Sequence, residues 1–127
     1  MKFYIIIMRC IKKFFLLGVV CFCCTVGFSS DSIKILYPNG GEILKTNTMV
    51  QIKWSSSTPK GKVILILYKK GIKHSVISKG TDNSGLFLWK IPQTVPEGKD
   101  YRVRIRMLNN LSVNDFSDRD FTIKKGR

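Results

Sequence analysis

Near the C-terminal end of the chain, apolar and basic side chains alternate strictly along one stretch. Successive side chains of a β-strand point to opposite faces of its sheet, so this alternation predicts a strand with one buried and one exposed face. A helix would scatter the apolar side chains around its axis and leave them without a common face. The apolar members are Tyr101, Val103, Ile105 and Met107, and the basic members between them are Arg102, Arg104 and Arg106.

Short strand-like runs fill residues 31–127, and turn signals separate them about every ten residues. One run, Val63–Tyr68, is apolar throughout, which is typical of a central strand covered on both faces. No segment carries an apolar stripe of helical length. The pattern predicts an all-β domain, an antiparallel β-sandwich of about seven strands. We expect these strands at residues 32–37, 49–54, 63–68, 72–78, 86–91 and 101–107, with one or two more within 113–124.

Two aromatic residues narrow the type of sandwich. Tyr101 follows the turn Pro96–Asp100 and opens a strand, which resembles the tyrosine corner of immunoglobulin-like and fibronectin type III domains. Trp54, on an early strand, stands where a fibronectin-type sheet has its core tryptophan. We therefore expect an immunoglobulin or fibronectin type III-like sandwich, with Trp54 and Trp89 in the core rather than exposed as platforms for sugar rings.

Residues 1–30 are a separate segment. All of its charged residues are basic and precede Phe14, and the 17 residues Phe14–Ser30 carry no charge. A positive start, an apolar stretch and small residues after it predict a signal peptide, in the form of a helix, that directs export. The apolar run is slightly shorter than the roughly 20 residues that span a bilayer, and an uncleaved membrane anchor within residues 9–30 is the alternative. The sandwich then comprises residues 31–127.

The sequence offers no catalytic, metal or cofactor constellation. All four cysteines (Cys10, Cys21, Cys23 and Cys24) lie in the apolar N-terminal segment, where cysteine behaves as one more apolar residue. His74 is the single histidine, and the acidic residues are few and stand mostly in turn-like contexts. We expect no enzymatic activity, no cofactor and no metal.

Several short motifs occur in a characteristic order: P-N-G-G-E at 38–42, I-x-W at 52–54, N-S-G-x-x-x-W-x-I-P at 83–92 and D-Y-x-V-x-I at 100–105. In this combination the sequence resembles the Ser-Thr-rich GPI-anchored family, also described as the N-terminal domain of yeast KNH-type cell-wall synthesis proteins. The resemblance covers nearly all of residues 31–127. It implies an exported domain of the fibronectin III or Ig-like kind, tied to wall β-glucan assembly or polysaccharide association, and it assigns no catalytic residue.

From the signal, the sandwich and the resemblance we expect a secreted or cell-envelope protein that acts as a non-catalytic binding or scaffold module. Its expected partners are surface polysaccharide or another surface protein. The sequence has neither a Ser/Thr-rich tail nor the C-terminal apolar tail that a GPI anchor requires, so a stand-alone exported module fits better than a fungal wall protein. A membrane contact is expected only through residues 9–30, if that segment is retained.

The excess of basic over acidic residues indicates an alternative function. Four of the +14 net charges belong to residues 1–30, leaving +10 on residues 31–127. The organised part of that charge is Arg102, Arg104 and Arg106, which strand geometry places on one outer face about 7 Å apart. Arginine binds carboxylate and phosphate groups in bidentate fashion, so these three residues are the candidate polyanion-binding site, with a solvated sheet face as the plainer interpretation. Nucleic acid is not an expected partner, because the protein is exported and lacks an aromatic platform among its basic residues.

Overall fold

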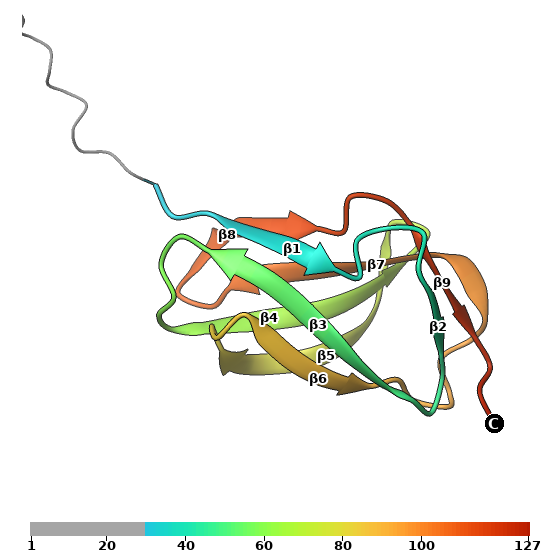
Figure 1. The fold of residues 1–127 in the computed structure, drawn as a ribbon. Coiled ribbons are helices and arrows are strands. Elements are labelled where there is room, and N and C mark those ends of the chain that lie inside the picture. Colours follow the sequence, from blue (N-terminus) through green and yellow to red (C-terminus); the bar gives the residue numbers. More distant parts are fainter. Residues whose placement is uncertain (1–29) are drawn as a thin grey trace, which may run out of the picture. The chain divides into compact units, whose positions relative to one another are not determined.

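The computed structural model describes residues 30–127, which form an all-β sandwich of nine strands in two sheets (Figure 1). The smaller sheet has the order β1-β3-β6, and the larger has the order β2-β9-β7-β4-β5, with β8 paired to β7. The predicted β-sandwich is confirmed, whereas the predicted signal peptide or anchor falls on residues outside the described part. The strands are β1 (Ile33–Tyr37), β2 (Ile43–Lys45), β3 (Met49–Ser56), β4 (Lys62–Lys69), β5 (Ile72–Asp82), β6 (Leu86–Lys90), β7 (Gly98–Met107), β8 (Asn110–Phe116) and β9 (Phe121–Lys124).

The strand count exceeds the expected seven for two reasons. The C-terminal stretch forms two separate strands, β8 and β9, and β2 is an additional strand of three residues, too short for alternation to show in the sequence. β2 pairs in parallel with β9, so the larger sheet contains a parallel pair beside its antiparallel ladders. This pairing joins the two ends of the domain, because β2 follows the first turn and β9 is the last strand.

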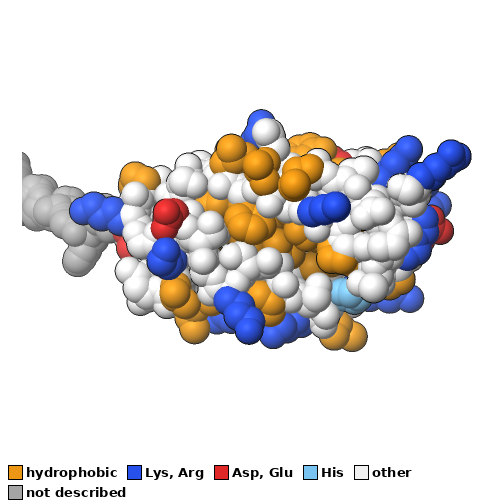
Figure 2. Space-filling model, turned by 90° about the horizontal axis from the view of Figure 1, so that it is seen from below, with side chains coloured by type: hydrophobic (Ala, Val, Ile, Leu, Met, Phe, Trp, Pro, Cys, Tyr) orange, Lys and Arg blue, Asp and Glu red, His pale blue; other side chains and the backbone are white. Residues whose placement is uncertain are grey.

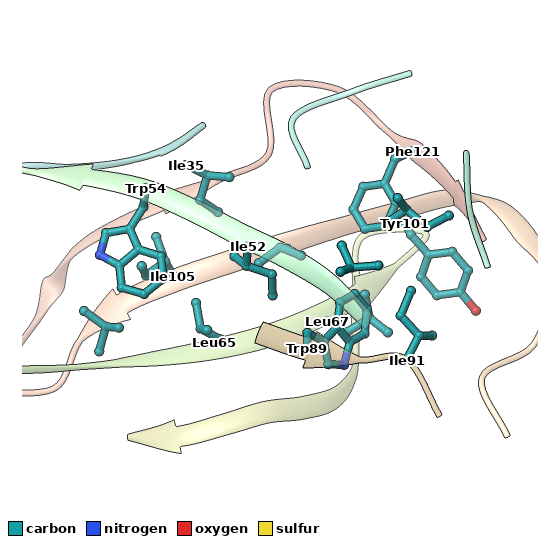
Figure 3. Packing of buried hydrophobic residues seen from close by; sticks show 14 of the residues in the cluster. Ile35, Ile52, Trp54, Leu65, Leu67, Trp89, Ile91, Tyr101, Ile105 and Phe121 are labelled. Carbon is teal, nitrogen blue, oxygen red and sulfur yellow. The ribbon is translucent and has the colours of Figure 1, made fainter. Parts of the chain in front are cut away.

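The core lies between the two sheets and takes alternate side chains from the strands on either side (Figure 3). All four apolar residues of β7 named above are buried, which confirms the alternation expected from the sequence. β4 is the central strand between β7 and β5. Leu65 and Leu67 of β4 enter the core, while Ile66 points to the other face and is still buried, as expected for a run that is apolar throughout.

Both aromatic predictions are confirmed. The Tyr101 hydroxyl donates a hydrogen bond of 2.6 Å to the carbonyl of Pro96, which is the contact that defines a tyrosine corner. Trp54 and Trp89 are buried in the core (Figure 3). The Trp54 indole donates a 2.7 Å hydrogen bond to the side-chain oxygen of Asn83, so its one polar group is satisfied inside the fold.

Candidate functional site

Among residues 30–127, no group of three or more His, Cys, Asp or Glu side chains could hold a metal ion. His74 lies exposed on β5, where its ring nitrogen is 3.3 Å from the Ser75 hydroxyl and its ring lies edge-on to Tyr101 at 6.2 Å. The described part also holds no helix long and apolar enough to cross a membrane. Two outer faces of the described residues are candidate binding surfaces.

The P-N-G-G-E motif is a structural clamp. The Glu42 carboxylate accepts hydrogen bonds from the backbone N–H groups of Asn39 and Gly40, at 2.9 and 2.7 Å, and closes the turn on itself. Gly40 and Gly41 have positive φ, and a Cβ on Gly40 would come within 2.6 Å of Arg119. Asn39 also bonds to Asp118 through both its side-chain oxygen and its amide nitrogen. The motif therefore ties the β1–β2 loop to the β8–β9 loop and is a turn, as its sequence indicates.

The predicted arginine site lies on the outer face of the larger sheet. We call this surface the arginine face. Its three arginines alternate with core residues along β7 and are each half-buried, so the structure places them on one face as the spacing predicted. Their cross-strand neighbours on β4 and β8 are largely apolar or aromatic. The arginine face consists of Arg102, Arg104 and Arg106 with Ile64, Ile66, Tyr68, Asn114 and Phe116.

Arg104 is held by neighbours on both sides. Its guanidinium donates to the Tyr68 hydroxyl at 3.0 Å and to the Asn114 side-chain oxygen at 3.2 and 3.3 Å. The guanidinium carbon lies 4.9 Å from the centre of the Phe116 ring and 5.9 Å from that of Tyr68. A guanidinium this close to aromatic rings adds a cation–π attraction to the hydrogen bonds. Arg104 therefore joins β4, β7 and β8 on this face of the sheet.

The other two arginines differ from each other. Arg102 forms an ion pair of 2.7 Å with Asp120, in the loop before β9, and both side chains are nearly half-exposed. Arg106 has a buried Nε without a hydrogen-bond partner in the described chain. The three residues thus share a face, while two of them already use their guanidinium groups within the domain.

A second ion pair involves β7 at its start. Lys69 donates a 2.8 Å hydrogen bond to Asp100, and its ammonium lies 5.1 Å from the centre of the Tyr101 ring. The hydrogen bond and charge of Lys69 lower the pKa of Asp100 below its usual 3.8, against an opposing effect of burial. Burial of the Tyr101 ring raises the pKa of its hydroxyl above 10.0, and the charge of Asp100 acts in the same direction.

The outer face of the smaller sheet, which we call the small-sheet face, was not identified from the sequence. Three of its apolar side chains are well exposed: Met49 at 61%, Leu88 at 55% and Leu86 at 44% of their full areas. Tyr37, Gln51 and Met49 border a shallow depression of about 300 Å³. The strand registers place these outward-facing residues side by side: Tyr37 on β1, Met49, Gln51 and Lys53 on β3, and Leu86, Leu88 and Lys90 on β6.

One sequence signal could have pointed to this face. The run Leu86–Trp89 is apolar at every position, so a strand formed from it has apolar side chains on both faces. Phe87 and Trp89 point inward and pack on the core, which leaves Leu86 and Leu88 outside. A short apolar run of this kind is ordinarily assigned to a strand covered on both faces, and β6 has no such cover in the described part.

Comparisons with solved structures return sandwiches of low sequence identity. The fibronectin(III)-like modules of Clostridium thermocellum CbhA share 14% identity, with 75% of this chain and 99% of that chain covered and a TM-score of 0.48. The CARDB domain of the PF1109 protein from Pyrococcus furiosus, solved in complex with di-metal ions, shares 15% identity over 79% of this chain and 97% of that one, with a TM-score of 0.39. A search of curated proteins finds no match.

A family model supplies the assignment. The Kre9/KNH-like N-terminal Ig-like domain matches residues 37–123, from the last residue of β1 to the third residue of β9. The match includes the P-N-G-G-E clamp, both tryptophans and the tyrosine corner. It confirms the KNH-type resemblance, and it does not extend to a GPI-anchored Ser-Thr-rich part. Ig-like domains are generally non-catalytic modules. This chain belongs to the Kre9/KNH-like family and carries its N-terminal Ig-like domain.

Proposed function

We propose that this chain is an exported, non-catalytic binding module of the cell envelope that attaches to a surface protein through the small-sheet face. The observation that carries the proposal is the composition of that face. Met49, Leu86 and Leu88 are exposed on one face of the sheet, and the charged residues among them, Lys53 and Lys90, are both basic. Exposed apolar clusters rimmed by polar groups are typical of interaction sites.

A protein partner fits this face better than a polysaccharide. Sugar recognition relies on exposed aromatic rings, and both tryptophans of the described chain are buried. The one aromatic side chain on the small-sheet face is Tyr37, which is 36% exposed. Leucine and methionine side chains instead suit apolar side chains of another protein. Association with polysaccharide remains the alternative that the experiment below separates.

The test measures retention of the protein on isolated cell envelopes. Wild type is compared with the triple variant Met49→Ser/Leu86→Ser/Leu88→Ser, on envelopes treated with protease, with glycan hydrolases or with neither. We expect retention to be lost in the variant and after protease treatment. Retention that the triple variant leaves unchanged would contradict a role of the small-sheet face, and retention sensitive only to the hydrolases would assign the module to polysaccharide.

Export and anchoring need their own measurement. We expect the protein in the secreted or envelope fraction, with an N-terminus at or near residue 31 if the predicted signal is cleaved. Fractionation and N-terminal sequencing of the recovered protein check both points. A chain that stays in the cytoplasm with its original N-terminus would contradict the proposal.

Polyanion binding by the arginine face is a second candidate function. Its specific support is the placement of three half-buried arginines on one face of a sandwich with a net charge of +10. Heparin affinity should then fall steeply with salt and should weaken in Arg104→Ser, provided that the variant still folds. Heparin elution at the same salt concentration for a folded Arg104→Ser and for wild type would contradict this function.

A further inference from the structure

The outer edge of β6 carries unpaired backbone groups. β6 forms a ladder only with β3, and it is an end strand of the smaller sheet. In that ladder the Trp54 N–H bonds to the Gly85 carbonyl, and the Ile91 N–H bonds to the Thr48 carbonyl. Hydrogen-bonded positions alternate along an antiparallel strand, so Phe87 and Trp89 also bond to β3. The N–H groups of Leu86, Leu88 and Lys90 therefore point away from β3, toward the open edge.

The edge strands β5 and β1 are protected against pairing with another chain. β5, the end strand of the larger sheet, pairs with β4 through three register shifts and carries exposed lysines, and the Gly80 N–H is bonded to the Ser78 hydroxyl. On β1, the N–H of Ile35 is bonded to the carboxylate of Asp115. Bulges, lysines and side-chain caps are the usual means by which proteins block an edge. β6 pairs with β3 in a regular register and ends with a single lysine. One cap lies at its start, where the Ser84 hydroxyl donates a 3.2 Å hydrogen bond to the Leu86 carbonyl, so the edge is open from the Leu86 N–H to Lys90.

The surroundings of the edge indicate what would pair with it. Lys53 lies directly across from Leu86 in the ladder, and Lys90 is across from Met49, so positive charge flanks the leucines on the outer side. On the inner side, the half-buried Phe87 and Ile77 reach the margin of the core. Figure 2 views the molecule from the side on which β5 and β6 lie, and hydrophobic side chains gather in the middle of that face with lysine and arginine around them.

We propose that β6 is a docking edge for an extended acidic segment of the partner protein, which adds a fourth strand to the smaller sheet. This inference rests on the proposed function and specifies its partner. The bound strand bonds to the backbone of Leu88 and Lys90 and to the N–H of Leu86. Its apolar side chains face Phe87 and Ile77, and its carboxylates lie on the outer side within reach of Lys53 and Lys90.

Two other occupants fit less well. A second copy of the chain could pair β6 with β6 around Leu88, but two domains of +10 charge repel each other. A lipid surface would leave the backbone groups of the edge without hydrogen-bond partners, since hydrocarbon offers none. An acidic strand satisfies the backbone and the charge together, and it is the occupant to which the proposal commits.

The test measures binding of a labelled synthetic peptide with the alternating sequence Glu-Val-Glu-Val-Glu-Val-Glu, by fluorescence anisotropy with the chain as recovered from its host. We expect saturable binding that weakens about fivefold in Lys90→Glu, because one cross-strand charge pair turns repulsive. Lys79→Glu on β5 is the matched control, with the same charge change on the other end strand, and should change affinity less than twofold.

The contribution of backbone hydrogen bonds to binding is tested by one change in the protein and one in the peptide. Leu88→Pro removes an N–H that points to the open edge, a position where proline is tolerated, and should abolish binding. If this variant fails to fold, a peptide N-methylated on alternate residues makes the same test on wild type and should not bind. Equal affinity of the methylated peptide, or of a lysine version of the peptide, would overturn the proposal.

Two further outcomes would change the occupant of the edge, and a third would contradict this inference without contradicting the proposed function. Sedimentation that shows a dimer dissociated by Leu88→Pro would replace the acidic strand by a second copy. Binding to anionic phospholipid vesicles without peptide binding would replace it by a membrane surface. If envelope retention still depends on Met49, Leu86 and Leu88 but the peptide is not bound, this inference fails while the proposed function stands.

Discussion

The two outer faces of the sandwich use their positive charges differently. On the arginine face, Arg102 is paired with Asp120, and Arg104 bonds to Tyr68 and Asn114. On the small-sheet face, Lys53 and Lys90 take part in none of the ion pairs of the described residues. All three of those ion pairs involve strands of the larger sheet or the loop before β9.

The difference shows that charges regularly spaced in the sequence are not for that reason free to bind a partner. The arginines stand out in the sequence because of their spacing, yet that spacing also lets them connect neighbouring strands. The lysines of the small-sheet face are scattered in the sequence, and they flank exposed leucines that nothing in residues 30–127 covers. We therefore expect substitutions on the arginine face to affect folding first and substitutions on the small-sheet face to affect binding first.

The largest effect should come from Arg104→Ala. The substitution removes the hydrogen bonds to Tyr68 and Asn114 and the cation–π contact with Phe116, and it should lower the free energy of unfolding by about 2 kcal/mol. Urea denaturation measures the change. Arg104→Lys, which keeps the charge but not the planar fork, should recover less than half of the loss. A stability equal to that of wild type in Arg104→Ala would show that the arginine face is not part of the scaffold.

A pH dependence should follow from the ion pair at the start of β7. Lys69 lowers the pKa of folded Asp100 below its usual 3.8, so the unfolded chain binds this proton more readily. The stabilisation is complete above the unfolded pKa and is lost as the pH falls through the lower, folded pKa. Denaturation between pH 6 and pH 2 should show this loss in wild type and a flatter profile in Lys69→Met, and identical profiles would refute it.

Alternation along one strand could be read directly from the sequence, and it located both faces of β7 correctly. The partners of the outward arginines could not be read in that way. Tyr68 stands 36 residues from Arg104 along the chain, and the two meet because β7 lies beside β4. Asn114 is ten residues away on β8, and its contact depends on the register of the β7–β8 pair. Strand order depends on the packing of the whole domain, and alternation along a single strand does not reveal that order.

The same limit explains why the small-sheet face was missed. The apolar run in β6 was identified as a strand, and only its position at the end of a sheet makes Leu86 and Leu88 exposed. By contrast, the tyrosine corner was predictable, because Tyr101 and Pro96 are close in sequence and their contact depends on one turn. The contact that depends on one turn was therefore recovered, and contacts that depend on strand register or strand order were not.

A smaller effect should follow from releasing Arg102. Asp120→Asn breaks an ion pair whose side chains are nearly half-exposed, so the free energy of unfolding should fall by no more than about 1 kcal/mol. The released guanidinium should raise the salt concentration needed for elution from heparin. Asp118→Asn is the matched control, because it changes the net charge equally in the same loop without an arginine partner. Equal elution of the two variants would mean that net charge alone sets the affinity.

The smallest effect on stability should come from Leu88→Thr. The side chain is more than half exposed, and threonine suits a strand, so the free energy of unfolding should change by no more than about 0.5 kcal/mol. Envelope retention should nevertheless fall, because Leu88 is an exposed apolar side chain of the small-sheet face, across from Gln51 and between Leu86 and Lys90. Leu111→Thr, an exposed leucine on β8, is the control and should leave retention unchanged. Loss of stability without loss of retention in Leu88→Thr would reverse the contrast between the faces, since it would make the leucine part of the scaffold.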